Sequence, residues 1–519
     1  MQVDKSALKR QSPYILGVAV GLGILFDVLF YGKLPGISFP LYIYLVLTVI
    51  LLAAKKSATL VPKRAALVMT PLVFFSGMVF VRASGFVTFL NITASLYLLG
   101  LLVYMMFRPD LKKYIFSDYL RPLHELPLHV YTRARETLSA FAGHHRAAGS
   151  LKVSPRVLRG ALVTVPVVGL FVILFASADL VFRSYIEELF DFQVDMQWLP
   201  RAILVVAVAF GFTGVLAYVL QKSAPKNQES AAAHSASKKS SSWDLFETTI
   251  LFTALNVLFF VFISLQLAYL FGGQQNVVGQ GFTYAEYARK GFFELIAVAV
   301  LSLGVITIAE KILLRKSQRH NPRFKFLAGA LIAQVLVIVV SAFNRLSLYE
   351  NAYGFTTLRL YSHLFLVWLA VIFCVLLYKI FWNRQENTFA FLSFGSVIVL
   401  LVVINVVNID AFVARKNIER YQATNKTGKL DAAYLTNLSD DAIVETSRLL
   451  DMPGFKSKDA LAGSLYWRYQ DLQHKNQHWQ SANLSREKAL RELESRKPLL
   501  EKNQNRIFEP YSFQEEPTR

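Results

Sequence analysis

Eleven apolar stretches, each about long enough to cross a lipid bilayer, occupy the first 408 residues of the chain. A helix needs about 20 apolar residues to span roughly 30 Å of hydrocarbon. A membrane β-barrel would instead show alternating segments of about ten residues. The sequence therefore predicts an all-α, polytopic transmembrane helix bundle of about eleven spans. The stretches lie near residues 13–31, 37–54, 65–82, 85–107, 157–177, 199–220, 248–271, 286–309, 324–343, 360–381 and 388–408.

The distribution of Lys and Arg predicts the orientation of these spans. With the N-terminus in the cytoplasm, the inner segments hold 28 basic residues and the outer loops hold 8. Cytoplasmic loops of membrane proteins carry such an excess of Lys and Arg. An odd number of spans then places the C-terminal segment on the outer side. We therefore expect a multi-pass protein with a cytoplasmic N-terminus and an extracytoplasmic C-terminus.

The net charge of +20 also comes from the Lys and Arg residues of the inner segments. Most of the excess lies in the short inner loops, whereas residues 409–519 carry 18 basic and 16 acidic side chains. No basic face interleaved with aromatic residues is present in a folded domain, as single-stranded nucleic-acid binding would need. The expected partner is the lipid bilayer, and nucleic acid is not expected.

The pattern divides the chain into four parts. A first four-helix transmembrane block covers residues 1–107, and a cytoplasmic amphipathic loop covers 108–156. A seven-helix transmembrane block follows at 157–408, interrupted by a polar, flexible cytoplasmic linker at 221–247. Residues 409–519, here called the tail, are expected to be a small helical extracytoplasmic unit with a disordered end.

Two serines mark expected helix starts in the tail. Ser439, with Asp440 and Asp441 behind it, and Ser485 are the residue types that cap helix N-termini. Apolar residues between and after them are numerous enough for a small helical core. That core either packs on itself or on the outer membrane face, or it forms a surface for an external protein partner.

Three segments together resemble a known bacterial family. They are Ser177-Ala178-Asp179, the string Gly281 to Leu295 (GFTYAEYARKGFFEL), and Asn405 to Tyr421 followed by Leu430 to Leu435. Over roughly residues 160–490 the chain resembles the domain-of-unknown-function 4173 family, related to the 4153 group, of multi-helix bacterial membrane proteins. The resemblance implies a location in the bacterial cytoplasmic membrane and no established activity.

Charged residues gather at the outer ends of the second block. Glu286 can pair with Arg289 or Lys290 on one helix face, because residues three and four apart are neighbours there. Glu294 enters the apolar stretch, where a carboxylate is expensive unless it is partnered or functional.

Further charged residues lie at the same membrane level, so the groups could converge on a cavity open to the exterior. Glu286, Glu294 and Asp410 would then oppose Arg345 and Arg359, which suits a lipid headgroup, an envelope precursor or a small ionic solute. The competing interpretation is an ion-pair network that only locks helices together. The candidate residues are Glu286, Arg289, Lys290, Glu294, Arg345, Glu350, Arg359, His363, Asp410 and Arg415.

Enzyme motifs are absent from the sequence. No Gly-rich phosphate loop, zinc-protease helix or nucleophile elbow occurs at a usable position. Cys374 is the single cysteine, which excludes an internal disulfide and a multi-thiolate metal site. The four histidines of the 108–156 loop lack accompanying carboxylates on one face. We expect no catalytic residues, no cofactor and no metal.

Two functional classes remain. The first is an accessory or cell-envelope-associated membrane protein, and the alternative is a secondary transporter of a small ionic or lipid-like solute. Polar residues inside or at the ends of spans favour transport, although Asp27 is expected to be wetted at the outer surface. The absence of a clear internal repeat opposes transport. The sequence predicts no oligomeric state. The polar residues concerned are Asp27, Asn91, Asn256, Gln266, Glu310 and Gln334.

Overall fold

Helices are the only regular elements in the part of the chain that the structure describes. This computed structural model confirms the all-α fold. The predicted fifth span, 157–177, lies outside the described residues except for Val168. The described residues are 5–57, 65–106, 111–145, 168, 179, 198–220, 245–271, 292–315, 321–382, 385–423, 430–475 and 477–508.

Within these ranges, nine helices are long and apolar enough to cross a membrane, and α3 is a shorter apolar helix. All ten coincide with predicted stretches, as expected when apolar length decides which segments can span. They are α1 (Lys5–Phe30), α2 (Ser38–Lys56), α3 (Ala66–Val81), α4 (Gly85–Met105), α8 (Trp198–Leu220), α10 (Leu245–Phe271), α13 (Phe292–Arg315), α14 (Pro322–Tyr353), α15 (Thr357–Phe381) and α16 (Glu386–Val407).

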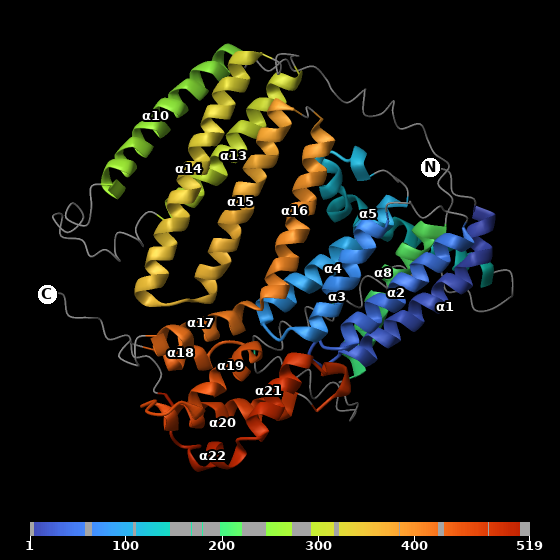
Figure 1. The fold of residues 1–519 in the computed structure, drawn as a ribbon. Coiled ribbons are helices and arrows are strands. Elements are labelled where there is room, and N and C mark those ends of the chain that lie inside the picture. Colours follow the sequence, from blue (N-terminus) through green and yellow to red (C-terminus); the bar gives the residue numbers. More distant parts are fainter. Residues whose placement is uncertain are drawn as a thin grey trace.

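The first transmembrane unit consists of α1 to α4 together with α8 (Figure 1). Helix α8 packs along α1, and α3 packs along α4. The core between these helices contains fully buried Ile15, Leu72, Phe75 and Leu101. Dispersion contacts of this kind hold helices together in a bilayer, where lipid tails are as apolar as the side chains.

Helix α5 (Phe116–His145) crosses this first unit. A short 3-10 helix, η1 (Leu111–Lys113), precedes α5. Helix α5 itself packs mainly on α8 and α1. The approach to α8 is so close that a Cβ atom on Gly214 would overlap the main-chain carbonyl of Val130. Phe116, Leu123 and other apolar side chains of α5 are exposed.

The second unit comprises α10 and α13 to α16 (Figure 1). Its core contains Phe252, Phe324, Val335 and Phe373, each at most 2% exposed. Helix α16 also packs against the core of the first unit, on which Phe394 and other side chains rest. The helix is therefore shared by both transmembrane units.

The tail forms a compact helical unit below the C-terminal ends of α3 and α16 and the N-terminal end of α4 in the view of Figure 1. Its core includes Leu461, Leu465, Tyr469 and Leu493. Burial of these side chains is the main contribution that holds such a small unit folded. The tail helices are α17 (Ile409–Ala423), α18 (Ala432–Thr436), η3 (Asp440–Ala442), α19 (Ile443–Ser447), η4 (Arg448–Asp451), α20 (Lys458–Lys475), η5 (Trp479–Ser481), α21 (Leu484–Glu494) and α22 (Lys497–Lys502).

A single residue joins the last membrane helix to the tail. Asn408 lies between α16 and α17 in the left-handed conformation, with φ of 53°. Asparagine reaches this region more readily than most residues with a side chain. The helix axis therefore turns at Asn408 and continues at once as α17.

The expected serine caps are only partly confirmed, since η3 begins directly after Ser439 but neither serine side chain caps a helix. Asn483, not Ser485, caps α21 by accepting hydrogen bonds from the main-chain N–H groups of Ser485 and Arg486. Ser439 makes no side-chain cap on η3 and donates its hydroxyl hydrogen bond to Asp410 instead. The local motif was misleading because both hydroxyls bind groups distant in sequence.

Candidate functional site

The tail completes helix ends that belong to the first transmembrane unit. Asp441 is 7% exposed, and its carboxylate accepts hydrogen bonds from the main-chain N–H groups of Ala83 and Ser84. The nearest donor–acceptor distance is 2.9 Å, to the Ser84 nitrogen. These N–H groups lie at the start of α4, where the first turn leaves donors without partners in the helix. Asp441 therefore acts as an N-terminal cap supplied from far along the chain.

Burial raises the pKa of the Asp441 carboxyl, because desolvation disfavours its charged form. The two main-chain N–H donors and the Arg82 guanidinium act in the opposite direction. Burial in turn lowers the pKa of Arg82 from its ordinary value. Asp441 and Arg82 thus share a partly dehydrated environment at the membrane edge.

The carbonyl end of α3 is capped from the same side. The side-chain amide of Asn483 donates to the carbonyls of Val79 and Arg82 at 3.0 and 2.9 Å, and the hydroxyl of Ser485 donates to Val81. The last carbonyls of a helix have no partner within it. The tail consequently satisfies both ends of the α3–α4 connection.

The α1–α2 loop is also bound by the tail. The main-chain N–H of Ile37 donates to the carbonyl of Ala482 at 2.9 Å, and the buried Arg486 donates to the carbonyl of Pro35. Burial lowers the pKa of Arg486, while neighbouring Asp440 and Asp441 oppose that change. Two separate outer loops of the first unit are therefore fixed by one segment of the tail.

Arg82 links this junction to α16. Its Nε donates to the main-chain carbonyl of Asn405 at 2.8 Å. Asn405 and Asn91 are almost fully buried and exchange two amide hydrogen bonds, at 2.9 and 2.8 Å. An amide pair satisfies polar groups that hydrocarbon cannot solvate. The space left around Arg82, Tyr361 and Asp410 has no room for a water-sized molecule and so cannot hold a ligand.

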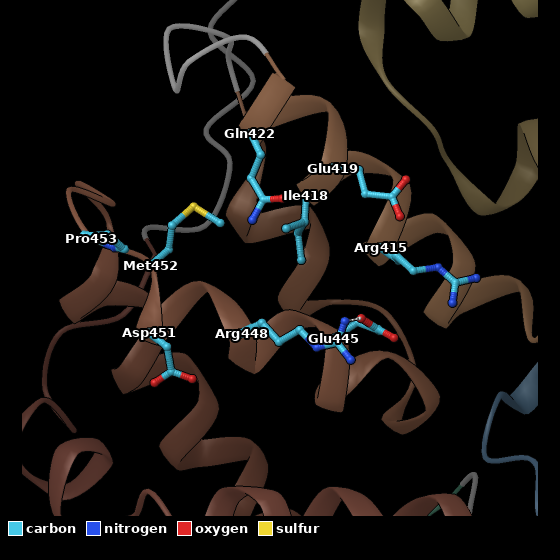
Figure 2. Close-up of a pocket in the computed structure, with 9 residues that line it drawn as sticks. All are labelled: Arg415, Ile418, Glu419, Gln422, Glu445, Arg448, Asp451, Met452 and Pro453. Carbon is cyan, nitrogen blue, oxygen red and sulfur yellow. Dashed lines mark ion pairs between the residues drawn. The ribbon is translucent and has the colours of Figure 1, made fainter.

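A wider pocket of about 490 Å³ opens on the tail surface (Figure 2). One wall comes from α17 and the other from the α19–η4 segment, and both carry charged side chains. Arg448 pairs with Glu445 at 2.6 Å, and the exposed Arg415 lies on the opposite wall. The lining residues are Arg415, Ile418, Glu419, Gln422, Glu445, Arg448, Asp451, Met452 and Pro453.

The α14–α15 hairpin holds a second polar group next to its turn. Nε2 of His363 lies 2.9 Å from a carboxylate oxygen of Glu350, and both residues are buried. Arg359 donates to the carbonyl of Gly354 and stacks over the ring of Tyr349, 4.2 Å from its centre. His363 and Arg359 are one turn apart, yet the structure gives them different partners.

The sequence-predicted candidates occupy several separate places. Glu286, Arg289 and Lys290 lie outside the described residues, and Glu294 is exposed in the first turn of α13. Arg345 is half-buried on α14.

Some of the remaining candidates have close neighbours in the structure. Glu350 and His363 are brought together, whereas Asp410 accepts from Ser439 in the tail junction. Arg415 lines the tail pocket.

The residues that sequence reasoning missed are Arg82, Asp441 and Asn483. An isolated Arg between two apolar stretches was the available indication for Arg82. The sequence indicated Asp441 only as part of a local helix cap behind Ser439. No pattern in the sequence linked it to α4.

The polar residues inside the spans find partners on other helices. Asp27 is 6% exposed and bonded to Arg201 of α8, so the prediction that it is wetted was wrong. Glu310 of α13 pairs with Lys379 of α15 at 2.6 Å, and both side chains are buried. Among the described residues, no group of three or more His, Cys, Asp or Glu is placed to hold a metal ion.

Comparison with known proteins gives one match. The family model described as "Domain of unknown function (DUF4153)" matches residues 69–449, which include α3 to α17 and the start of the tail. No curated protein and no solved structure matches the chain.

Proposed function

The chain belongs to the domain-of-unknown-function 4153 family, and we propose that it is an accessory protein of the bacterial cell envelope that presents a ligand pocket on its tail. Membership of the narrower 4173 group is part of this proposal. The apolar helices establish an integral membrane protein. The observation that carries the pocket proposal is the firm attachment of the tail to the outer loops of the first unit.

The attachment matters because it gives the pocket a fixed position beside the membrane. Caps from Asp441 and Asn483 hold the tail to the α3–α4 connection, and α17 continues from α16. Binding sites on rigid supports lose less entropy when a ligand arrives. A pocket held in this way suits a ligand that is itself attached to the membrane.

The two arginines suggest the class of ligand, although the same lining carries the carboxylates of Glu419, Glu445 and Asp451. Arg415 and Arg448 can each bind phosphate or carboxylate oxygens through two parallel N–H groups. The apolar floor of Ile418 and Met452 can contact the adjoining carbon chain. We propose an anionic lipid headgroup or a lipid-linked envelope precursor, which share a phosphate group next to an apolar chain.

A binding experiment tests this pocket. Short-chain phosphatidylglycerol would be titrated into the full-length protein in a neutral detergent. Replacing both Arg415 and Arg448 with alanine should weaken binding at least about tenfold, since one charge-assisted contact is worth about 1.5–3 kcal/mol. Arg491→Ala, which removes an exposed guanidinium of the tail outside the pocket, is the matched control. Equal affinity in the double variant and the control would contradict the proposal.

The orientation of the chain is proposed from its charges. The tail contacts the α1–α2, α3–α4 and α14–α15 connections, so these loops and the tail lie on one face. The distribution of Lys and Arg places that face outside. A reporter near Ser237 should therefore be cytoplasmic and one after Arg519 external. Finding both reporters on the same side would refute this topology.

Secondary transport is the second candidate, favoured by the buried Glu310–Lys379 pair between α13 and α15. Transporters use such intramembrane charges for coupling ions. Replacing both residues by Gln and Met removes the charges without leaving one unpaired, which is often neutral for stability. A folded double variant that restores the envelope phenotype of a deletion strain would exclude a transport role for this pair.

A further inference from the structure

The outer end of the α14–α15 hairpin contains a buried acid–base pair that the tail pocket does not use. Glu350 is 5% exposed and His363 8% exposed. The imidazole also packs edge-on against Phe343, with ring centres 4.3 Å apart. The pair is thus enclosed by apolar surface on at least one side.

Each partner has a polar atom left over. The second carboxylate oxygen of Glu350, Oε1, and the second ring nitrogen of His363, Nδ1, have no hydrogen-bond partner among the described residues. Buried polar atoms are nearly always paired, so an exception in a membrane helix calls for a functional explanation. A purely structural ion pair would be expected to satisfy both partners.

Charged and titratable groups around the pair come from several elements. The hairpin itself contributes Arg345, Tyr349 and Arg359, and Arg359 is turned to Gly354 and Tyr349. Two packed neighbours complete the surroundings. Glu294 of α13 is exposed, and Arg420 of α17 approaches Gly354.

The adjoining helices add little charge at this level. In the described part of α10 the polar group is Gln266, which binds Ser341, and α16 ends in the buried Asn405. The net charge at this place therefore depends chiefly on whether the pair of Glu350 and His363 holds a proton.

We propose that Glu350 and His363 form a reversible proton-binding site at the outer end of the second transmembrane unit. The ligand is a proton taken from the outer aqueous phase. With the proton bound, the pair is an imidazolium and a carboxylate, or their neutral forms, and its total charge is zero. When water accepts the proton, a neutral imidazole and an ionised carboxylate remain. The step changes no other bond.

Position and chemistry both support a proton as the ligand. Glu350 directly precedes the exposed Asn351 and lies within the last turn of α14, so the path to the surface is short. Histidine is the side chain that ordinarily changes charge between about pH 5 and 8. Two protein groups with one contact between them are too few for a metal site.

Loss of the proton should loosen the hairpin. The remaining carboxylate is a buried net charge, which is costly in an apolar environment. The hairpin turn is bonded to α17 through two hydrogen bonds between Phe355 and Asn417, at 2.9 and 2.8 Å. A change at the pair therefore reaches the tail through this turn. The site does not depend on the proposed lipid ligand.

The test measures thermal unfolding of the full-length protein in detergent from about pH 5 to 9. The dependence of the unfolding midpoint on pH should differ between the wild type and the variants Glu350→Gln and His363→Gln. Glu294→Gln, which alters an exposed carboxylate at the same membrane level, should follow the wild type. Profiles of all three variants parallel to the wild type would overturn the proposal.

A second measurement serves if His363→Gln does not fold. Histidine ring carbons labelled with ¹³C report the protonation of each imidazole in the wild-type protein by NMR. One ring signal should change its titration in Glu350→Gln and remain unchanged in Glu294→Gln. If no ring signal responds to Glu350→Gln, the pair binds no exchangeable proton and the proposal is wrong.

Discussion

Substituting Asp441 by alanine should release the tail from the first transmembrane unit. The change removes the acceptor for the N–H groups of Ala83 and Ser84 at the start of α4. A buried donor without an acceptor costs about 1–3 kcal/mol. Alanine also avoids the desolvation of the carboxylate, which offsets part of the loss. The expected net cost of the substitution is about 2–3 kcal/mol.

Limited proteolysis of the tail measures this cost. Where opening and closing are faster than cleavage, the cleavage rate follows the population of the open form. A cost of about 2–3 kcal/mol then raises the rate roughly 30- to 150-fold. The protease would be added to the outer face of oriented vesicles that contain the full-length protein.

The matched control is Asp451→Ala, which removes a carboxylate that pairs with Arg496 at 2.6 Å but is 66% exposed. Exposed ion pairs contribute about 0–1 kcal/mol, so the rate should rise less than about sixfold. Equal cleavage rates for the two variants would refute the argument that Asp441 acts as a buried cap.

Three further outcomes follow from the same structure. Because burial raises the pKa of Asp441, folding of the tail is favoured most below the ordinary value of 3.8, and this pH-dependent part of the stability is lost as the pH rises through the folded value, while the capping contacts remain. Cleavage of the wild type relative to Asp441→Asn should therefore increase from about pH 4 to neutrality, and a constant ratio would contradict the shift. A double-mutant cycle on Asn91 and Asn405 should give a coupling of about 1 kcal/mol, with about 1.7 as an upper bound, in equilibrium unfolding; additive effects would exclude the amide pair. Gly214→Ala should lower the unfolding midpoint because its Cβ overlaps α5, whereas Gly211→Ala has open space and should not; equal midpoints would contradict the close crossing.

The spans were predictable because apolar length is a local property of the chain. Each described membrane helix coincides with a predicted stretch, and Pro71 inside α3 did not prevent the helix. The hydrogen-bond and ion-pair partners of polar side chains inside the bundle were harder to predict from the sequence. Asp27 gave no indication in the sequence that Arg201, 174 positions later, would cover it.

The contacts between the tail and the start of α4 were even harder to predict from the sequence. Asp441 and the α4 start it caps are separated by 357 positions or more, and the residues around Asp441 favoured a local cap just as well. Hydrogen bonds between distant segments depend on how the units pack, and local motifs do not encode that. The pair of Glu350 and His363 was partly accessible, because both stood among the predicted outer charges.

Only Asn408 separates α16 from α17, so the two helices are closely coupled. A flexible linker at this position would absorb any motion of the tail, but a left-handed turn between two helices transmits rotation. At the opposite end of the same helix, the side chain of Asn387 donates to the carbonyl of Lys112 in η1, just before α5. The two ends of α16 are thereby connected to the tail and to the segment just before α5.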